Sequence, residues 1–221
     1  MKIKFAIAML LILGFACSQN EKVQSENQKL TDIEKIAQAY GLEKFEDINY
    51  LQYTFNVERD SIILVSRTWK WNRRTGEIIA INSEDTVSFR QNALTDELKK
   101  LDHRFINDKY WLLFPYQLIW DSNMTYTNEG LQTAPISSDQ LIKLTIQYAN
   151  DVGYTPGDAY DLYLDENWII REWEFRKSGK ERPGSMVTWE GYTDLNGVLL
   201  ATNHTNKDGS FRLFFTNIKF E

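Results

Sequence analysis

The sequence predicts a mainly β protein of the α+β class, in which a single large curved antiparallel sheet, or open barrel, of about ten to eleven strands holds two helices in its concavity. Three observations support this fold class. Aromatic residues are abundant, with 12 Phe, 11 Tyr and 7 Trp against 4 Pro, and aromatic side chains favour half-buried strands. Apolar and polar residues alternate in many short segments, whereas only two segments carry an apolar stripe at helical spacing. The 221 residues show no break in composition, so we expect one folded domain, residues 30–221, after a leader and a tether.

The first 16 residues are a predicted signal peptide, in which Lys2 and Lys4 precede an apolar run over residues 5–15. This run is about half of the roughly 20 residues that a membrane-spanning helix needs. The single cysteine, Cys17, follows directly, which is the arrangement of a bacterial lipoprotein. We therefore expect cleavage before Cys17 and a membrane anchor of acyl chains such as palmitate, since two or more chains hold a protein stably on a membrane. Ordinary signal-peptidase cleavage after Ala16 is the alternative.

Residues 17–29 are the predicted lipidated cysteine and its tether, because residues 18–29 are polar and show no apolar period. The relaxed cleavage box and this polar tail resemble lipoproteins of the Bacteroidetes type. Because no Asp follows Cys17, the common inner-membrane retention signal is absent. We expect the protein in the cell envelope, anchored to the outer membrane. The sequence does not distinguish its periplasmic side from the cell surface.

The domain is expected to begin with a short helix. Thr31 is a favourable N-cap, Glu34 completes a capping box, and Gly41 is a natural stop. Strands follow over residues 51–57, 63–71, 77–82 and 86–90. A second helix begins after Thr95, with its apolar stripe on Leu94, Leu98, Leu101 and Phe105.

The aromatic segment 110–120 follows the second helix. Pro115 argues against a regular helix there, and we expect residues 111–118 to pack under the sheet. After a loop over residues 128–138, six more strands are predicted at 141–148, 159–164, 168–176, 186–192, 198–204 and 211–220. The pairs Asn196-Gly197 and Asp208-Gly209 mark hairpin turns.

This order of elements resembles the LolA-like superfamily, the lipoprotein carrier and localisation-factor fold. The segment 110–118, Tyr-Trp-Leu-Leu-Phe-Pro-Tyr-Gln-Leu, is similar to a Trp-Leu-Leu-x-Pro-aromatic stretch of these proteins, as is the late Trp189 before Asn196-Gly197-Val198. The resemblance covers most of residues 30–221. It implies an open barrel of about eleven strands with helices as a lid over an apolar cavity that holds acyl chains. Soluble carriers carry no lipid anchor, so a chain anchored at Cys17 resembles the membrane-bound receiving type or a member with another task.

Composition and motifs argue against several classes of function. The net charge of −6 disfavours a nucleic-acid partner. One Cys and 2 His leave no disulfide framework or thiolate zinc site, and we expect neither a metal nor a cofactor. There is no nucleophile elbow, P-loop or dinucleotide fingerprint, and His103 and His204 are expected to be surface or half-buried side chains. We therefore expect no enzyme. The alternating carboxylates on two neighbouring predicted strands are expected on a solvated face: Asp161, Asp165, Glu172 and Glu174.

The candidate ligand site is the set of residues expected to line the concave face of the sheet. Arg67 and Arg171 stand out, because each lies between inward apolar residues and needs either a ligand head group or a buried carboxylate as partner. The candidate lining residues are Phe55, Val65, Arg67, Trp69, Trp71, Leu112, Phe114, Arg171, Trp173 and Phe175.

These residues predict a monomeric, membrane-anchored protein that binds an acyl chain, lipid or other apolar ligand. The alternative is an envelope interaction protein with a fully packed core that binds a glycan or a partner protein. Asp60-Ser61 and Asp85-Thr86 also fit a three-residue pattern for O-glycosylation.

Overall fold

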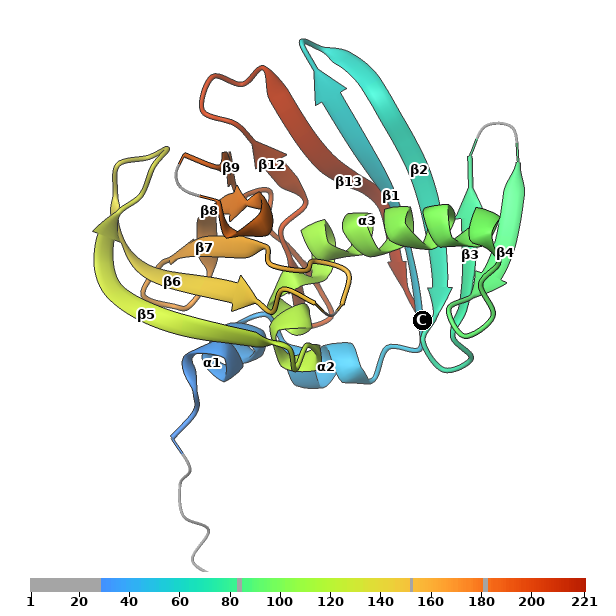
Figure 1. Ribbon diagram of the computed structural model, residues 1–221, viewed down its shortest axis with the longest axis horizontal. Helices are drawn as coiled ribbons and strands as arrows, with labels where there is room; N and C mark the ends of the chain where they lie inside the picture. Colours follow the sequence, from blue (N-terminus) through green and yellow to red (C-terminus); the bar gives the residue numbers. More distant parts are fainter. Residues whose placement is uncertain (1–28, 83–84, 152, 181–182) are drawn as a thin grey trace, which may run out of the picture.

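The computed structural model of the protein describes residues 29–82, 85–151, 153–180 and 183–221 (Figure 1). The predicted leader, Cys17 and the tether up to residue 28 lie outside the described residues. The described helices are α1 (Asp32–Ala39), α2 (Leu42–Glu46), α3 (Asp96–Trp120) and a 3-10 turn, η1 (Lys177–Gly179).

The described strands are antiparallel and form two large sheets and a ribbon. The six-stranded sheet has the order β12-β13-β1-β2-β3-β4, the five-stranded sheet has the order β5-β6-β7-β8-β9, and β10-β11 is a separate pair. Their bounds are β1 (Tyr50–Arg59), β2 (Ile62–Asn72), β3 (Glu77–Ile81), β4 (Thr86–Arg90), β5 (Met124–Thr133), β6 (Gln140–Tyr148), β7 (Ala159–Leu164), β8 (Ile170–Arg176), β9 (Ser185–Thr188), β10 (Thr193–Leu195), β11 (Val198–Leu200), β12 (Asn203–Thr205) and β13 (Phe211–Phe220).

The predicted fold class is confirmed, since antiparallel sheets curve around helix α3 without closing into a barrel (Figure 1). The strands divide between two sheets, however, instead of forming one. The division lies after β9, where the chain leaves the five-stranded sheet at Thr188. A single bridge between Glu190 and Asn203 then connects this region to the start of β12.

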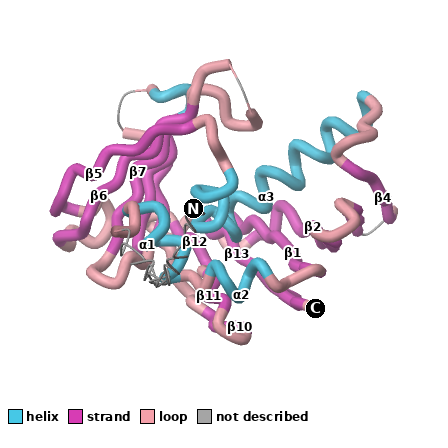
Figure 2. The backbone as a smooth tube through the Cα atoms, turned by 90° about the horizontal axis from the view of Figure 1, so that it is seen from below, coloured by secondary structure: helices cyan, strands magenta, loops and turns pink. Residues whose placement is uncertain are grey.

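Helix α1 begins as the sequence predicts. The Thr31 N–H donates to Glu34 Oε2 at 2.7 Å, and the Thr31 hydroxyl accepts from the Glu34 N–H at 3.4 Å, which completes the capping box. Gly41 ends the helix with φ +82°, and its backbone approaches the carbonyl of Gly197 so closely that a side chain would not fit. Seen from below, α1 and α2 cover the end of the domain near β10 and β11 (Figure 2).

The expectation that Pro115 excludes a helix over residues 110–120 is wrong. Helix α3 runs from its N-cap Thr95 to Trp120, with a kink at Leu113 where φ is −115° and ψ is 17°. Because proline lacks an N–H and crowds the preceding turn, the helix bends two residues before it and then continues. The packing prediction for residues 111–118 is confirmed, since Leu112, Leu113 and Phe114 are at most 1% exposed.

The predicted loop over residues 128–138 is also wrong in its first half, because β5 extends from Met124 to Thr133. This edge strand is exposed along most of its length, so its sequence shows no alternation of buried and exposed residues. The hairpin turn at Asn196-Gly197 is confirmed between β10 and β11, with positive φ at both residues. Within the described residues, no helix is both long enough and apolar enough to span a membrane.

An aromatic cleft beside helix α3

The predicted site residues on β1 and β2 share one face, and helix α3 covers them. Phe55 and Trp69 are 2% and 1% exposed, while Val65 and Trp71 are half-buried. The ring of Phe105 from α3 lies edge-on to both Trp69 and Trp71, at centroid distances of 5.4 and 5.8 Å. These rings pack as core. Beside them, Val65, Arg67 and Trp69 also line an open groove of about 360 Å³ between β2 and the start of α3.

Arg67 has a buried carboxylate as its partner, which is one of the two alternatives that the sequence left open. Its Nε and Nη2 donate to Asp108 of α3 at 2.9 and 2.7 Å. Trp69 Nε1 donates to the same carboxylate at 2.8 Å. Because Asp108 is fully buried, these bonds satisfy a charge that would otherwise be costly, and they fix α3 to the six-stranded sheet.

The expected inward position of Arg171 is wrong. Its side chain is 46% exposed and binds Asp165 through Nε and Nη2, at 2.9 and 2.6 Å. The cause is a bulge in β8: Tyr163 pairs with Glu172 and Leu164 with Ile170, so Arg171 has no partner in the register. A bulge interrupts the alternation of faces and turns this side chain outward.

The other predicted residues meet around the second half of α3. Leu112 and Phe114 are buried, and the Phe114 ring lies 5.3 Å from that of Trp173 on β8. Trp111 contacts Trp173 at a centroid distance of 4.6 Å. Trp173 itself is 2% exposed, and Phe175 is half-buried.

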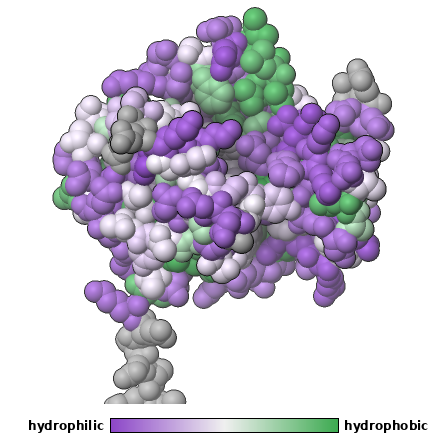
Figure 3. Space-filling model, viewed as in Figure 1, coloured by the Kyte–Doolittle hydropathy of each residue, from purple (hydrophilic) through white to green (hydrophobic). Residues whose placement is uncertain are grey.

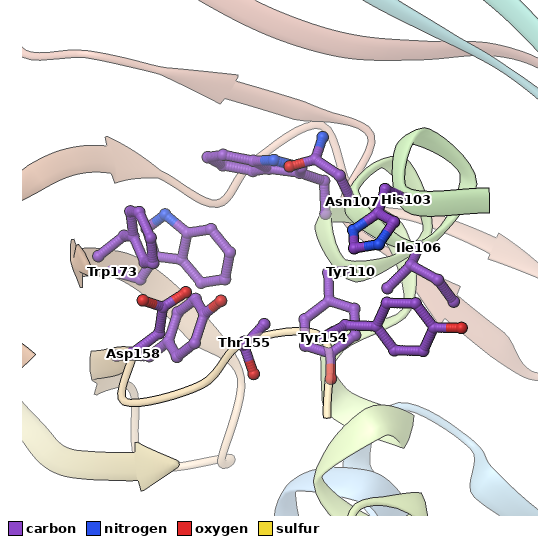
Figure 4. A pocket seen from close by; sticks show the side chains of 11 residues that line it. His103, Ile106, Asn107, Tyr110, Tyr154, Thr155, Asp158 and Trp173 are labelled. Atoms are coloured by element: carbon purple, nitrogen blue, oxygen red, sulfur yellow. The ribbon is translucent and has the colours of Figure 1, made fainter. Parts of the chain in front are cut away.

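An open cleft of about 160 Å³ lies between α3 and strands β7 and β8. In Figure 4 the side chains of His103, Asn107 and Tyr110 reach into it from α3, with Trp173 across from them and the loop carrying Thr155 below. Trp173 and Phe175 are the members of the predicted set that line this cleft. The remaining lining residues are Ile106, Trp111, Tyr154, Asp158 and Tyr160.

Trp111 and Tyr110 are absent from the predicted site because residues 110–120 are not predicted to be helical. On a helix, positions 103, 107, 110 and 111 recur every three or four residues and share one face, which is the signal that identifies this wall of the cleft. Tyr154 lies in the β6–β7 loop, and no spacing rule places a loop residue against a distant helix.

A second cavity of about 220 Å³ adjoins the cleft, and Ile106, Tyr110, Tyr154 and Thr155 line both. Its other lining residues include Lys109, Gln117 and Asp121. Asp121 lies in its wall and accepts hydrogen bonds from the hydroxyls of Tyr110 and Tyr148, at 2.6 and 2.8 Å. Burial, and secondarily the Asp121 carboxylate, raises the pKa of the Tyr110 hydroxyl, so Tyr110 remains a neutral donor.

The expected solvated face of carboxylates on β7 and β8 is wrong, because three of the four are buried and hydrogen-bonded. Glu172 accepts from the backbone N–H groups of Ile136 and Ser137, both at 2.8 Å. Asp161 accepts from Thr145 and from Arg176, and Glu174 accepts from the Gly184 N–H at 2.6 Å. These carboxylates fix loops and neighbouring strands to the outer face of the five-stranded sheet.

The two histidines occupy different environments. His103 is exposed at the rim of the cleft. His204 is fully buried, contrary to the expectation, and its Nδ1 lies 3.2 Å from the Thr188 carbonyl. Burial lowers its pKa to about 3, so the imidazole is neutral. The described residues contain no group of three His, Cys, Asp or Glu side chains arranged to hold a metal ion.

Comparison with models of known protein families gives no match, and comparison with curated proteins gives none. Several solved structures share the general arrangement. A DUF1329 family protein from Desulfovibrio piger is 6% identical with a TM-score of 0.46, and the match covers 86% of this chain and 92% of that one. A putative outer membrane lipoprotein-sorting protein domain from Vibrio parahaemolyticus is 14% identical, with a TM-score of 0.41 and coverage of 85% and 91%.

A LolA superfamily protein from Nitrosomonas europaea is 10% identical, with a TM-score of 0.41 and coverage of 86% and 92%. Its name is that of the superfamily which the sequence resembles. Since all three scores lie below 0.5, the likeness has no bearing on what the present chain binds.

Proposed function

We propose that this protein is a membrane-anchored lipoprotein of the bacterial cell envelope that binds, without converting it, an acyl chain or another apolar part of a lipid in the aromatic cleft. The observation that supports this function is the cleft itself, because Trp111, Tyr160 and Phe175 line an open space with largely aromatic walls between α3 and the five-stranded sheet. Ligand sites are concave, mostly apolar and bordered by a few polar groups, and this cleft has those features.

The size of the cleft limits the ligand. Its volume of about 160 Å³ is close to that of an engineered apolar cavity of roughly 150 Å³ that binds benzene. The cleft therefore accommodates one segment of an acyl chain, and the rest of a longer lipid extends through its open side or into the adjoining cavity.

The test is titration of residues 18–221, which contain every described element, with a fluorescent fatty acid, using tryptophan quenching as the readout. We expect saturable quenching, and at least a tenfold weaker dissociation constant for Trp111→Ala. Trp168→Ala is the matched control, because this half-buried Trp lies in the turn between β7 and β8 and does not line the cleft. Absence of saturable binding, or equal losses in both variants, would contradict the proposal.

The anchor is tested separately at Cys17. Changing Cys17 to Ser is expected to abolish incorporation of labelled palmitate and to release the protein from membranes. A variant that stays membrane-bound to the same degree would disprove the lipoprotein assignment.

A second candidate is an interaction protein that binds a partner through the exposed end of β2. Ile62, Ile63 and Leu64 are 64%, 48% and 58% exposed, and Figure 3 shows this apolar patch at the top of the molecule. Contiguous exposed apolar residues are typical of interaction sites. The acceptor residues of the two predicted glycosylation patterns are also exposed: Ser61 lies in the turn before β2 and Thr86 at the start of β4.

A photo-crosslinker at Leu64, compared with one at Leu131, tests this second candidate. Leu131 is the matched control because it is 66% exposed in a different hairpin. Crosslinks to one defined protein from position 64, and none from position 131, would favour the interaction function. Equal crosslinking at both positions would reject it.

A further inference from the structure

The second cavity, next to the aromatic cleft, contains a buried cation without a hydrogen-bond or ion-pair partner among the described residues. Lys109 of α3 is 8% exposed and lines this cavity. Its ammonium lies over the rings of Trp71, Phe105 and Trp120, at 5.4, 5.9 and 5.9 Å. Among the described residues, no acceptor lies within hydrogen-bond or ion-pair distance of it. Burial lowers its pKa to about 8, in accord with a charged group that is incompletely compensated.

The same cavity contains an acceptor that lacks a donor. Gln117 is 6% exposed, and its Oε1 has no hydrogen-bond partner in the part of the chain that the structure describes. Its Nε2 donates to Asp121 Oδ1 at 2.7 Å, which fixes the orientation of the amide. Buried polar groups are nearly always satisfied, so an unused donor and an unused acceptor in one cavity indicate what is to be bound there.

The carboxylates around Lys109 define the charge of the ligand. Asp102 and Asp121 both act on the Lys109 ammonium electrostatically, from beyond ion-pair distance. Asp102 already accepts from Tyr154 and Gln91, at 2.7 and 2.8 Å. The Arg73 guanidinium is a second cation that acts on Lys109, so two carboxylates and two cations balance, and neither an anion nor a cation meets an excess of opposite charge. The cavity therefore favours a neutral group that both accepts and donates hydrogen bonds.

Resting on the proposed acyl-binding function, we propose that this cavity binds the neutral, hydroxyl-bearing head group of an amphiphile, such as a glycerol or a sugar, while the acyl chain lies in the aromatic cleft. Lys109 donates to one head-group oxygen, and Gln117 Oε1 accepts from a hydroxyl. These two residues lie on either side of the kink at Leu113 and line the same cavity, where a head with several hydroxyls would meet both. Ile106, Tyr110, Tyr154 and Thr155 line the passage between head and chain.

The test compares three ligands with one alkyl chain and different heads: decyl glucoside, decanoate and decyltrimethylammonium, each titrated below its micelle concentration into residues 18–221. Decyl glucoside is expected to bind at least tenfold more tightly than the other two. Equal binding of all three, or tighter binding of decanoate or of decyltrimethylammonium, would overturn the head-group assignment and leave acyl binding intact. No binding of any of them would overturn acyl binding as well.

Variants locate the effect. Lys109→Met is expected to weaken decyl glucoside binding at least tenfold and to leave decyltrimethylammonium binding unchanged or stronger. Lys99→Met is the control, because this Lys lies on the same helix in an exposed pair with Asp96. Gln117→Leu is a second variant, checked for folding by near-ultraviolet circular dichroism, and is expected to weaken decyl glucoside binding in the same way. Unchanged glucoside affinity in both cavity variants would overturn the assignment.

Discussion

Asp108 and Lys109 are neighbours on helix α3, and both are almost completely buried, yet their environments are opposite. Asp108 accepts four hydrogen bonds, two from Arg67, one from Trp69 Nε1 and one from Asn107 Nδ2 at 3.1 Å. The Lys109 ammonium contacts aromatic rings and, within the described structure, has no hydrogen-bond or ion-pair partner. A buried charge with a complete set of partners fixes the fold, whereas one without partners lies where a ligand is expected.

The two sheets show the same difference on a larger scale. The six-stranded sheet presents Phe55 and Trp69 to the first half of α3, and both side chains are buried core. The five-stranded sheet meets α3 around Trp111 and Trp173, where an open cleft remains. A groove also remains between β2 and α3, but Trp69 is the one aromatic residue among the described residues that line it, whereas the cleft against β8 is lined by several aromatic rings. The bend at Leu113 lies in this second region.

The largest effect is expected from a new unpaired charge on the same helix. Leu113 is fully buried at the kink, so Leu113→Asp is expected to lower the free energy of unfolding by several kcal/mol, on the order of 4 kcal/mol, in urea denaturation. Leu98→Asp, at a half-buried position in the first turn of α3, is the control and is expected to cost less. An unchanged midpoint for Leu113→Asp would place this segment at the surface instead.

Removing the partner of Asp108 tests the first half of the comparison. Arg67→Met leaves the buried carboxylate without its cation. Because the Arg67 side chain is 25% exposed, we expect a loss of about 3 kcal/mol in unfolding free energy. Arg171→Met removes an exposed pair with Asp165 and is expected to cost less than about 1 kcal/mol. Similar losses of unfolding free energy in the two variants would show that the Arg67–Asp108 pair stabilises the fold no more than an exposed ion pair does.

His204 tests burial through the pH dependence of stability. Its pKa is about 3 in the folded chain and about 6.5 in the unfolded chain, so the unfolded state binds the additional proton between these values. The contribution of the neutral His204 to the free energy of unfolding is therefore fully present above pH 6.5. It is lost as the pH decreases toward 3, with a slope on the order of 1 kcal/mol per pH unit. His204→Leu is expected to flatten the profile over this range relative to the wild type. Parallel profiles would contradict the neutral, buried histidine.

The smallest effect is expected at Lys109. Replacing a buried, uncompensated ammonium by an apolar side chain of similar length is often neutral or stabilising, so Lys109→Met is expected to change the unfolding free energy by less than about 1 kcal/mol. Thermal denaturation of this variant beside Arg67→Met sharpens the contrast between the two charges. A loss of several kcal/mol at Lys109 would mean that the ammonium is part of the fold and is not reserved for a ligand.

Local signals predicted the parts of the fold that depend on neighbouring residues. The capping box at Thr31, the strand over residues 51–57 and the Asn196-Gly197 turn are each decided within a few residues, and each is confirmed. The division into two sheets was not predictable in this way. It depends on contacts between β9 and β12, which belong to different sheets and are joined near Glu190 by an isolated bridge to Asn203.

The candidate site was predicted in part for the same reason. Trp173 and Phe175 follow from alternation along β8, but the bulge at Arg171 has no local sequence signal. Pro115 predicts the end of a helix, but α3 continues through it, and for this reason Trp111 is not among the predicted cleft residues. The partners of Arg67 and the absence of partners at Lys109 are contacts between distant elements, and a single sequence does not specify them.

The central claim is that an acyl chain lies in the aromatic cleft between α3 and β8. The most direct measurement is a crystal structure of residues 18–221 with decyl glucoside that carries bromine on its terminal carbon, located by anomalous scattering. The account predicts a bromine peak among Trp111, Tyr160 and Trp173, with the sugar near Lys109. A bromine peak at the exposed Ile62–Leu64 patch, or at any other place outside the cleft when the ligand is fully occupied, would contradict it.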